Sequence, residues 1–456
     1  MTCHTKSRRV SILIGCLFLI AALSAIWPAY RAFLNIEIDE NEGWNAYFAD
    51  AAMGRMALYP SRDLLITNNY PPLSFYITGG LGRLIGDPIL AGRLLSLVAV
   101  AVIAAGVALM VKRLGGGTLE ACIGAAYFVA TMCRFFSSYT GTNDPHLLAQ
   151  AIMTLGFVAF MRAATEDRGY IAPILLMVAA GFIKHKIVVM PLASMVWLGI
   201  HRPRRMVRCG LVAVCAIVAG FALCFAAFGE NFLFNFTSPR IFHLGHSIGA
   251  VGHLQWVAVG LVIWLYVGWT RRADPGVRIC NLLIGLGLLL FFIQKSGDGV
   301  AHNAQFELVF GVSIGVGLAF AQAPLLPPAR SFPTDTLRFA GLLAICLRLV
   351  LSTRVELVRL LADASFHTEI ANREAAMAAT VSRIKMIPGD VLCDPFASYR
   401  AGKPFVVDYF NCGQRMRAGK LPSDAISKLV ASGKLTAVQT DPLLSWSNLP
   451  DAGQIH

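Results

Sequence analysis

The chain has 456 residues, of which 56% are apolar and only 14% are charged, and its mean hydropathy is +0.62. This composition excludes a water-soluble globular protein, because so few charged residues cannot cover a domain of this size. The apolar residues must therefore face lipid. The net charge of +13 is explained by the Lys and Arg residues that membrane proteins carry in their cytoplasmic loops, and it does not indicate a nucleic-acid partner.

Apolar segments recur along the first three quarters of the chain, and a spanning helix needs roughly 20 predominantly apolar residues. They predict an all-α polytopic membrane protein with about eleven transmembrane helices. The expected spans are 10–29, 88–111, 118–138, 146–162, 170–183, 187–200, 209–228, 254–270, 278–294, 304–322 and 336–352. The two around Lys184 are short.

The first apolar segment has two interpretations. The basic run ending at Arg9 and the apolar stretch after it have the shape of a cleaved signal peptide. The stretch is longer than the roughly 7 to 15 residues of a signal peptide's apolar region, which favours a membrane anchor.

The basic residues predict the orientation of the chain. If Lys6, Arg8 and Arg9 are cytoplasmic, the alternating connections on the same side are all basic. These connections are Lys112-Arg113, 162–168, 202–208, 271–278 and the Pro-rich link around Arg330. We therefore expect a bacterial inner-membrane protein with a cytoplasmic N-terminus and a periplasmic C-terminal part.

The chain divides into an expected transmembrane domain, residues 1–352, and an expected α/β tail module, residues 353–456. In the tail the patterns predict a helix at 368–386, strands at 390–394 and 404–409, a short helix after Ser423 and an apolar run at 435–438. Such a small module is expected to pack on the outer face of the membrane domain.

Cysteine usage points to one testable pairing. Of the eleven cysteines, only Cys393 and Cys412 fall in the exported tail. An oxidising compartment would allow these two thiols to form a disulfide, but free buried thiols are the alternative.

Unusual polar residues collect in the loops of the outer side. The loops hold an acidic cluster after the first span, Asn143-Asp144-Pro145, Lys184-His185-Lys186, a segment with Arg240, His243 and His246, and Lys295 to Asn303. Ionisable groups beside membrane segments are costly to desolvate and mark functional sites. The loops therefore predict a site at the outer membrane surface.

These residues resemble the GT-C fold glycosyltransferases that use polyprenyl-phosphate sugars, of the protein mannosyltransferase and aminoarabinose transferase type (family 39-like). The matching pieces occur in the family's order. They are the acidic motif after the first span, the stretch from Leu58-Tyr59-Pro60 to Tyr70-Pro71-Pro72-Leu73, the Asp144 loop, the Lys184-His185 loop with Pro191, and Ser296-Gly297-Asp298-Gly299 to Asn303. The resemblance covers roughly residues 5 to 325 and implies transfer of a sugar from a lipid phosphate.

Such a transfer needs a carboxylate that takes the acceptor proton and cations that stabilise the departing phosphate. Asp39 matches the family's first acidic position and is the expected general base. Glu40 adjoins it as a substrate-binding candidate, and Glu42 is a second candidate base because residues three apart can share a helical face. The alternative is that these acids only favour a helix N-terminus.

Asp144 precedes Pro145 and is expected to cap the next helix. By resemblance it is also a second active-site acid that orients the acceptor or a metal. Tyr70 and Pro72 border the lipid-sugar cavity in the family, although the proline can simply fix a turn at the membrane surface.

Several cations are candidates for the donor phosphate. Lys184 matches a family position, with His185 beside it, although lysines at helix ends also extend to the membrane surface without a binding role. Arg240 offers a planar fork that suits phosphate oxygens. His243 and His246 could be metal ligands, but no third ligand is close in sequence, so we predict no metal site there.

The segment from Lys295 through Asp298 to His302 and Asn303 can bind phosphate or sugar hydroxyls through backbone amides, or can be a plain tight turn. The sequence predicts no cofactor, and a divalent metal stays an open alternative. No Gly-rich nucleotide loop is present in the sequence. The expected partners are a lipid-linked sugar donor, membrane lipids and an acceptor that is a glycan, lipid or protein.

We therefore expect a membrane glycosyltransferase that acts on the periplasmic face. The alternative is a transporter or flippase for a lipid-linked or anionic substrate, which would place ionisable residues near the middle of the bilayer. A non-catalytic assembly protein would leave the polar loops unexplained.

Overall fold

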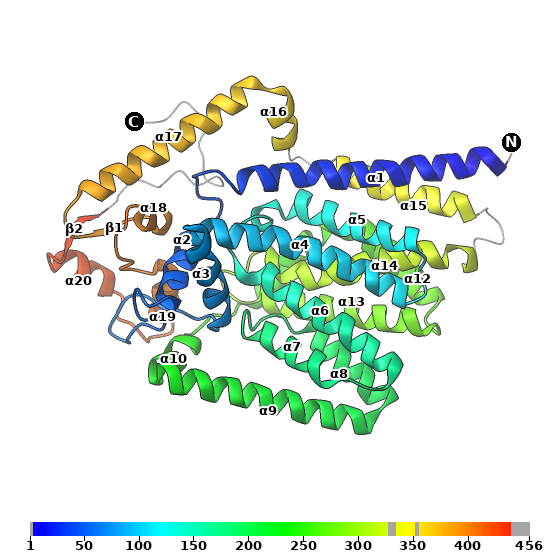
Figure 1. The fold of residues 1–456 in the computed structure, drawn as a ribbon, viewed down its shortest axis with the longest axis horizontal. Helices are drawn as coiled ribbons and strands as arrows, with labels where there is room; N and C mark the ends of the chain where they lie inside the picture. Colours follow the sequence, from blue (N-terminus) through cyan, green and yellow to red (C-terminus); the bar gives the residue numbers. More distant parts are fainter. Residues whose placement is uncertain (1–2, 327–333, 352–354, 439–456) are drawn as a thin grey trace.

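The computed structural model describes residues 3–326, 334–351 and 355–438. Most of these residues are helical, and the helices of the larger part run roughly parallel to the long axis of the molecule (Figure 1). The expected basic connection around Arg330 and the expected domain boundary at residues 352–353 lie outside the described residues.

Each of the predicted spans is a helix in the bundle. The bundle helices are α1 (Cys3–Arg31), α4 (Pro88–Arg113), α5 (Thr118–Phe135), α6 (Pro145–Glu166), α7 (Ile171–Gly181), α8 (Val189–His201), α9 (Pro203–Phe228), α12 (Ala258–Thr270), α13 (Pro275–Lys295), α14 (Phe306–Gln322) and α15 (Thr334–Val350). Almost every residue of α14 is buried, so this helix forms the centre of the core. In contrast to α14, the helix α9 lies at the edge of the bundle (Figure 1), and most of its side chains are exposed or only partly buried.

Fewer helices than expected can cross a membrane on their own. Within the described part of the chain, six helices are long and apolar enough, or seven if the bent pair Leu244–Trp256 and Ala258–Thr270 counts as one span. The helices α7 and α8 are apolar but have only 11 and 13 residues. The all-α polytopic architecture is confirmed, whereas the expected number of about eleven full spans is not.

Aspartate followed by proline starts several helices. Asp87, Asp144, Asp274 and Asp394 accept hydrogen bonds from backbone amides at the starts of α4, α6, α13 and α18, and a proline follows each. Proline suits the first helical position because it lacks the amide hydrogen that would be unpaired there. The expected capping role of Asp144 is thus confirmed.

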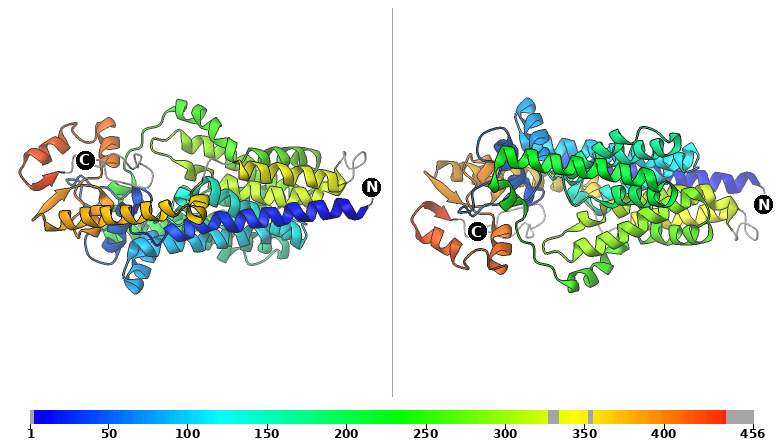
Figure 2. Two further views of the ribbon diagram at one scale, coloured as in Figure 1. Left: turned by 90° about the horizontal axis from the view of Figure 1, so that it is seen from above. Right: turned by 90° about the horizontal axis from the view of Figure 1, so that it is seen from below.

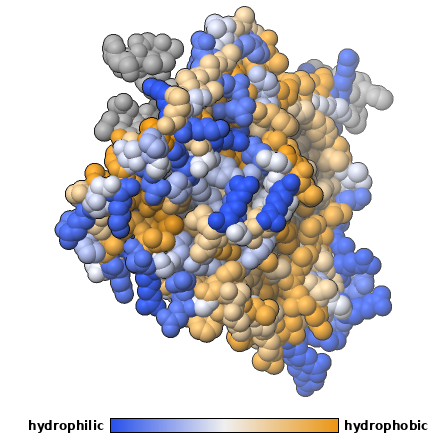
Figure 3. Space-filling view, turned by 60° about the vertical axis from the view of Figure 1, so that its left-hand side comes forward, coloured by the Kyte–Doolittle hydropathy of each residue, from blue (hydrophilic) through white to orange (hydrophobic). Residues whose placement is uncertain are grey.

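Shorter helices form a layer over one end of the bundle (Figures 1 and 2). They are α2 (Asn41–Ala52), α3 (Leu73–Ile85), α10 (Glu230–Phe236) and α11 (Leu244–Gly249). Four 3-10 helices lie in connections along the chain and are not all at this end: η1 (Ser137–Tyr139), η2 (Ala250–Trp256), η3 (His302–Gln305) and η4 (Ala323–Leu325). Figure 3 shows hydrophobic side chains over the bundle and hydrophilic ones gathered towards its ends.

The tail lies at the same end of the bundle as α2 and α3 (Figure 1). It contains α16 (Glu356–Ala362), α17 (Ala364–Met386), β1 (Asp390–Leu392), α18 (Pro395–Arg400), α19 (Tyr409–Arg417), α20 (Ala425–Ala431) and β2 (Leu435–Val438). The strands β1 and β2 pair in parallel. The helix predicted at 368–386, the strand near 390 and the helix after Ser423 are confirmed.

The strand predicted at 404–409 is wrong. The segment makes only an isolated bridge between Val407 and Leu65, and α19 begins at Tyr409. Asp408 N donates to Leu65 O at 2.8 Å. The alternating apolar residues of 404–409 are covered by the loop of the membrane domain that contains Leu65. This loop is too short to form a strand of a sheet. Cys393 and Cys412 are both free thiols, and Cys412 is buried, so the structure does not contain the disulfide considered from the sequence.

The tail packs closely on α2. A Cβ atom at Gly43 would lie 2.3 Å from Phe396 N and 2.3 Å from Pro395 C, both of which are backbone atoms. Backbone cannot move aside as a flexible side chain can. The absence of a side chain at Gly43 therefore sets how closely α18 approaches α2.

We predict that Gly43→Ala separates the tail from α2 and lowers the unfolding free energy by about 1 to 3 kcal/mol, as overpacking does. Thermal unfolding in detergent and limited proteolysis of the tail would measure both effects. Gly80→Ala is the matched control, because a Cβ atom at Gly80 in α3 has no neighbour within 4 Å. Equal stability of the two variants would contradict the tight docking of the tail.

Candidate active site

A cavity of about 520 Å³ lies where the tail meets the bundle. The loop before α2, the loops before α3, α6 and α8, the segment around Arg240, the η3 loop and the tail all contribute to its wall. Its polar and aromatic lining includes Asp39, Glu40, Asn41, Trp44, Asn69, Tyr70, Tyr139, Asp144, Lys184, Lys186, Arg240, Asn303, Asp394, Tyr409, Phe410 and Asn411. Segments far apart in the sequence thus build one cavity.

Asp39 is held in place by its neighbour and directed towards the cavity. The backbone N and the side-chain Nδ2 of Asn41 both donate to Asp39 Oδ1, at 3.0 and 2.7 Å. Burial raises the pKa of Asp39 to about 6, although the bonds from Asn41 act in the opposite direction. A carboxylate with a pKa just below neutrality is well suited to take a proton at pH 7.

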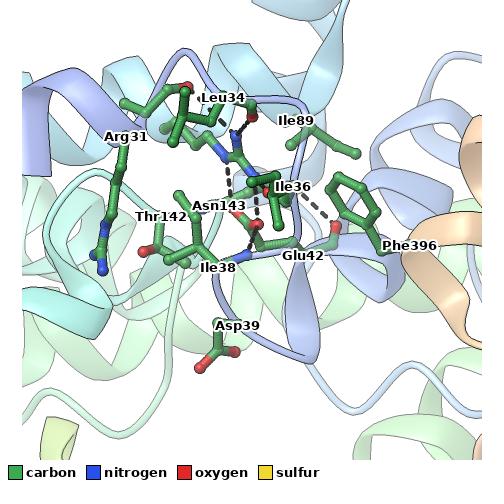
Figure 4. Close-up of polar contacts among 12 residues, drawn as sticks. Arg31, Leu34, Ile36, Ile38, Asp39, Glu42, Ile89, Thr142, Asn143 and Phe396 are labelled. Carbon is green, nitrogen blue, oxygen red and sulfur yellow. Dashed lines mark hydrogen bonds and ion pairs between the residues drawn. The ribbon is translucent and has the colours of Figure 1, made fainter. Parts of the chain in front are cut away.

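Glu42 has a different environment, because both of its oxygens form a buried ion pair with Arg93. The distances are 2.7 Å from Nε to Oε1 and 2.6 Å from Nη2 to Oε2, and Glu42 is fully buried. The amides of Ile38 and Asn143 donate to the same carboxylate. Figure 4 shows this cluster, with Asp39 pointing away from it.

Glu42 is therefore a structural residue, and the prediction that it could serve as a base is corrected. The prediction assumed that Asp39 and Glu42 share a helical face. Asp39, however, precedes the start of α2 at Asn41, so helical spacing does not apply to it. Glu42 also does not line the cavity.

Acidic groups surround Asp39. Glu37 is buried, and burial together with the charges of Asp394 and Glu42 raises its pKa to about 10, so it is neutral at pH 7. Asp394 enters from the tail, and burial raises its pKa as well. Neutral Glu37 adds no negative charge to the cavity, so it is ionised Asp39 that favours a developing positive charge there.

Lys184 connects two predicted site residues. Its Nζ lies 3.3 Å from Asp144 Oδ2 and donates to the Tyr70 hydroxyl at 3.0 Å. Burial lowers the pKa of Lys184, but the charges of Asp144 and Tyr70 outweigh burial, so the pKa is raised and the lysine is cationic. Asp144 thus caps α6 with Oδ1 and also pairs with Lys184.

Lys186 and Arg240 bring two further cations to the cavity. Burial, Arg240 and Lys184 lower the pKa of Lys186 to about 7. Burial lowers the pKa of Arg240 also. Arg240 lies over the Phe410 ring at 4.9 Å and donates to Asp298 O. An anion bound between Lys186 and Arg240 would relieve the repulsion that these cations exert on each other.

Some predicted site residues do not line the cavity. Lys295 Nζ donates to Val300 O at 2.6 Å, and Asp298 binds Arg417 and Gln414 of α19, so both act in local structure or tail docking. Pro72 precedes α3, His185 packs against Phe236, His243 packs against His246, and His302 packs against Trp256. Asn303 does line the cavity.

The tail residues of the cavity were missed by the sequence reasoning. Asp408 Oδ2 accepts from Trp44 Nε1 at 3.1 Å, and Asn69 Nδ2 donates to Asn411 at 3.3 Å. These contacts join positions more than 300 residues apart, and no local pattern marks them.

The described residues contain no group of three or more His, Cys, Asp or Glu side chains that could hold a metal ion. His243 and His246 lack a third ligand, and their nearest acid is Asp298, whose Oδ1 lies 3.9 Å from His246 Nδ1.

Comparisons with known proteins identify the fold. Residues 69–228 match the model of a family described as dolichyl-phosphate-mannose-protein mannosyltransferase. The fold is similar to ArnT from Cupriavidus metallidurans in the apo state, with a TM-score of 0.58 and 13% identity over 91% of this chain and 90% of that chain. For the same protein bound to undecaprenyl phosphate, the TM-score is 0.57 and the identity 13% over 94% and 91%. No curated protein sequence matches the chain.

The chain is thus a multi-pass membrane protein with the GT-C fold of the protein mannosyltransferase and ArnT type. The resemblance predicted from the sequence is confirmed at the level of the fold.

We predict that Glu42→Gln lowers the unfolding free energy by about 3 to 5 kcal/mol, because it leaves the buried Arg93 without its counter-charge. Thermal unfolding in detergent would measure this. Asp39→Asn is the control, since a neutral side chain costs less to bury than the carboxylate and should keep or raise the unfolding temperature. A Glu42→Gln variant as stable as the wild type would contradict the structural assignment.

Proposed function

We propose that this protein is a glycosyltransferase that moves a sugar from a polyprenyl phosphate to an acceptor in the cavity at the outward, periplasmic end of the bundle. One observation carries the proposal. A single cavity holds a carboxylate with a pKa near 6, Asp39, together with three cations, Lys184, Lys186 and Arg240, of which Lys184 is paired with Asp144.

The reaction assigns a task to each group. Asp39 takes the proton of the acceptor nucleophile, which attacks the anomeric carbon, while the bond from that carbon to the phosphate oxygen breaks. The phosphate leaves on the lipid, and the cations stabilise its charge. The negative charge of Asp39 favours an oxocarbenium-like transition state before the proton is transferred.

The comparisons support this proposal through the ligand in the similar structure. ArnT from Cupriavidus metallidurans has been solved with undecaprenyl phosphate bound, and the present fold spans nearly all of that chain. The sugar and the acceptor are set by scattered side chains with no local signature. A transporter is less well supported, because the charged residues of the cavity come from loops and the tail at one end of the bundle.

We predict that Asp39→Asn lowers sugar transfer by about 100-fold or more, because it removes the base but keeps size and hydrogen bonding. The assay follows consumption of radiolabelled polyprenyl-phosphate sugars by purified protein. Glu230→Gln, which neutralises an exposed carboxylate outside the cavity, is the control and should keep most of the activity. Wild-type turnover of Asp39→Asn would sink the base assignment.

The rate of transfer should also depend on pH through Asp39. Its raised pKa of about 6 means that the carboxyl becomes protonated, and therefore inactive as a base, as pH falls through 6. We expect the rate to fall about tenfold per pH unit below that point. A rate that stays constant down to pH 4 would show that another group is the base.

Donor binding should be coupled to proton uptake by Lys186. Its pKa of about 7 is low because the lysine is buried and other cations face it, so a bound phosphate should raise the pKa and draw a proton onto the lysine. We expect the affinity for undecaprenyl phosphate to fall as pH rises above 7. Fluorescence titration or calorimetry in detergent would measure this dependence.

Lys186→Gln should bind more weakly at pH 6 and lose the decline that sets in above pH 7. Lys295→Gln is the matched control, because Lys295 lies outside the cavity and donates to Val300 O. An unchanged affinity in Lys186→Gln, or an equal loss in Lys295→Gln, would contradict the phosphate site.

A further inference from the structure

Arg240 lies in a segment without regular secondary structure. The segment connects α10 to α11, and residues 238–241 belong to neither a helix nor a strand. Ordering a side chain on such a segment costs conformational entropy, because many positions are open to it. Contacts from other elements must therefore fix Arg240 before it can meet a phosphate in a defined geometry.

The first of these contacts come from the loop between α13 and η3. His243 N donates to Ser296 O at 2.7 Å, and Asp298 N donates to Ile241 O at 2.9 Å. Arg240 adds a bond of its own, since its Nη1 donates to Asp298 O. The position of Arg240 therefore depends on that of Asp298.

Gln414 of the tail joins the segment to this loop. Its Oε1 accepts from Ile241 N at 2.8 Å, and its Nε2 donates to Asp298 Oδ2 at 2.9 Å. Gln414 is fully buried, so water cannot replace either bond when the other atom is lost. One side chain thus binds both the residue that follows Arg240 and the residue whose carbonyl accepts from Arg240.

The helix α19 makes two further contacts from the same face. Phe410 lies four residues before Gln414 and Arg417 lies three residues after it, so the three side chains are neighbours on the helix. The guanidinium of Arg240 lies over the Phe410 ring at 4.9 Å, and Arg417 Nη2 lies 2.6 Å from Asp298 Oδ2. Asp298 therefore gives its carbonyl to Arg240 and its carboxylate to α19.

We propose that Gln414 is a positioning residue that holds Arg240 at the donor phosphate. The inference rests on the proposed function and adds that the phosphate site depends on the tail. Gln414 does not line the cavity, whereas Arg240 does, so Gln414 acts through Arg240. A guanidinium binds phosphate through N–H groups in a fixed plane, and a shift of its segment would misalign them.

The test is a double-mutant cycle on the affinity for undecaprenyl phosphate, measured by calorimetry with the full-length protein in detergent. Gln414→Leu removes both hydrogen bonds at similar size. We expect it to weaken binding about tenfold, as for the loss of one hydrogen bond to a charged group. Arg240→Gln should weaken binding at least as much. In the Arg240→Gln background Gln414→Leu should add no further loss, because the residue that it positions is gone.

A second pair of variants tests the hydrogen bonds by rescue. Gln414→Glu keeps an acceptor for Ile241 N but places a carboxylate against that of Asp298, so it should weaken binding. Adding Asp298→Asn supplies an amide that can donate to the new carboxylate. The affinity of this double variant should return to within about twofold of the wild type.

Arg415→Gln is the matched control. Arg415 is buried on the same helix and also docks the tail, but it donates to Leu64 O and Arg62 O and does not line the cavity. Its replacement should leave the affinity for undecaprenyl phosphate unchanged. Limited proteolysis of every variant separates undocking of the tail from a local shift of Arg240.

Wild-type affinity in Gln414→Leu, a loss that adds to that of Arg240→Gln, or an equal loss in Arg415→Gln would overturn the inference. If Arg240→Gln weakens donor binding and donor consumption depends on Asp39 in that case, the proposed function stands without it. Full affinity in Arg240→Gln would instead contradict the phosphate site of the proposed function, and the inference with it.

Discussion

The buried ion pair between Arg93 and Glu42 holds together the end of the molecule at which the tail docks. Charges taken out of water are costly unless their hydrogen-bonding groups are satisfied. Here Arg93 donates to the carbonyls of Leu34 and Ile36 as well as to Glu42, and Glu42 accepts from the amide of Asn143. One pair therefore fixes the chain after α1, the start of α2, the helix α4 and the loop before α6 (Figure 4). This arrangement also fixes the backbone beside Asp39, because Glu42 accepts from the amide of Ile38.

The cavity that results separates two kinds of charge. Acids gather around Asp39, and burial and mutual repulsion keep Glu37 neutral. Cations gather around Lys186, where burial and their repulsion lower its pKa. In the proposed reaction the phosphate of a polyprenyl-phosphate sugar lies beside these cations, and its anomeric carbon, which develops positive charge, lies beside Asp39. The tail closes this space, and its docking through Asp408 and Gly43 is thus part of the site.

Much of this could be predicted from the sequence, where the signal was local. Apolar segments predicted the bundle helices, Asp-Pro predicted the start of α6, and a lysine between two short helices predicted Lys184 at the cavity. The number of full spans was not predictable, because α7 and α8 are apolar but short. Glu42 was misinterpreted because its role depends on a partner about 50 residues away. Arg93 did carry a signal, since a single charge inside an apolar span requires a buried partner.

The tail shows where such reasoning ends. Its helix α17 followed from the sequence, but the segment around Val407 pairs with Leu65 of the membrane domain, and its cavity residues meet partners more than 300 positions away. Alternating apolar residues indicate that one face of an extended segment is buried. They do not indicate which other element of the protein buries it.

A cryo-electron microscopy structure of the protein with a polyprenyl-phosphate lipid bound tests the central claim most directly. The account predicts phosphate density within hydrogen-bonding distance of Lys186 and Arg240, with Asp39 facing the position of the anomeric carbon across the cavity. A headgroup bound outside this cavity, or one that leaves these cations without a contact, would contradict it.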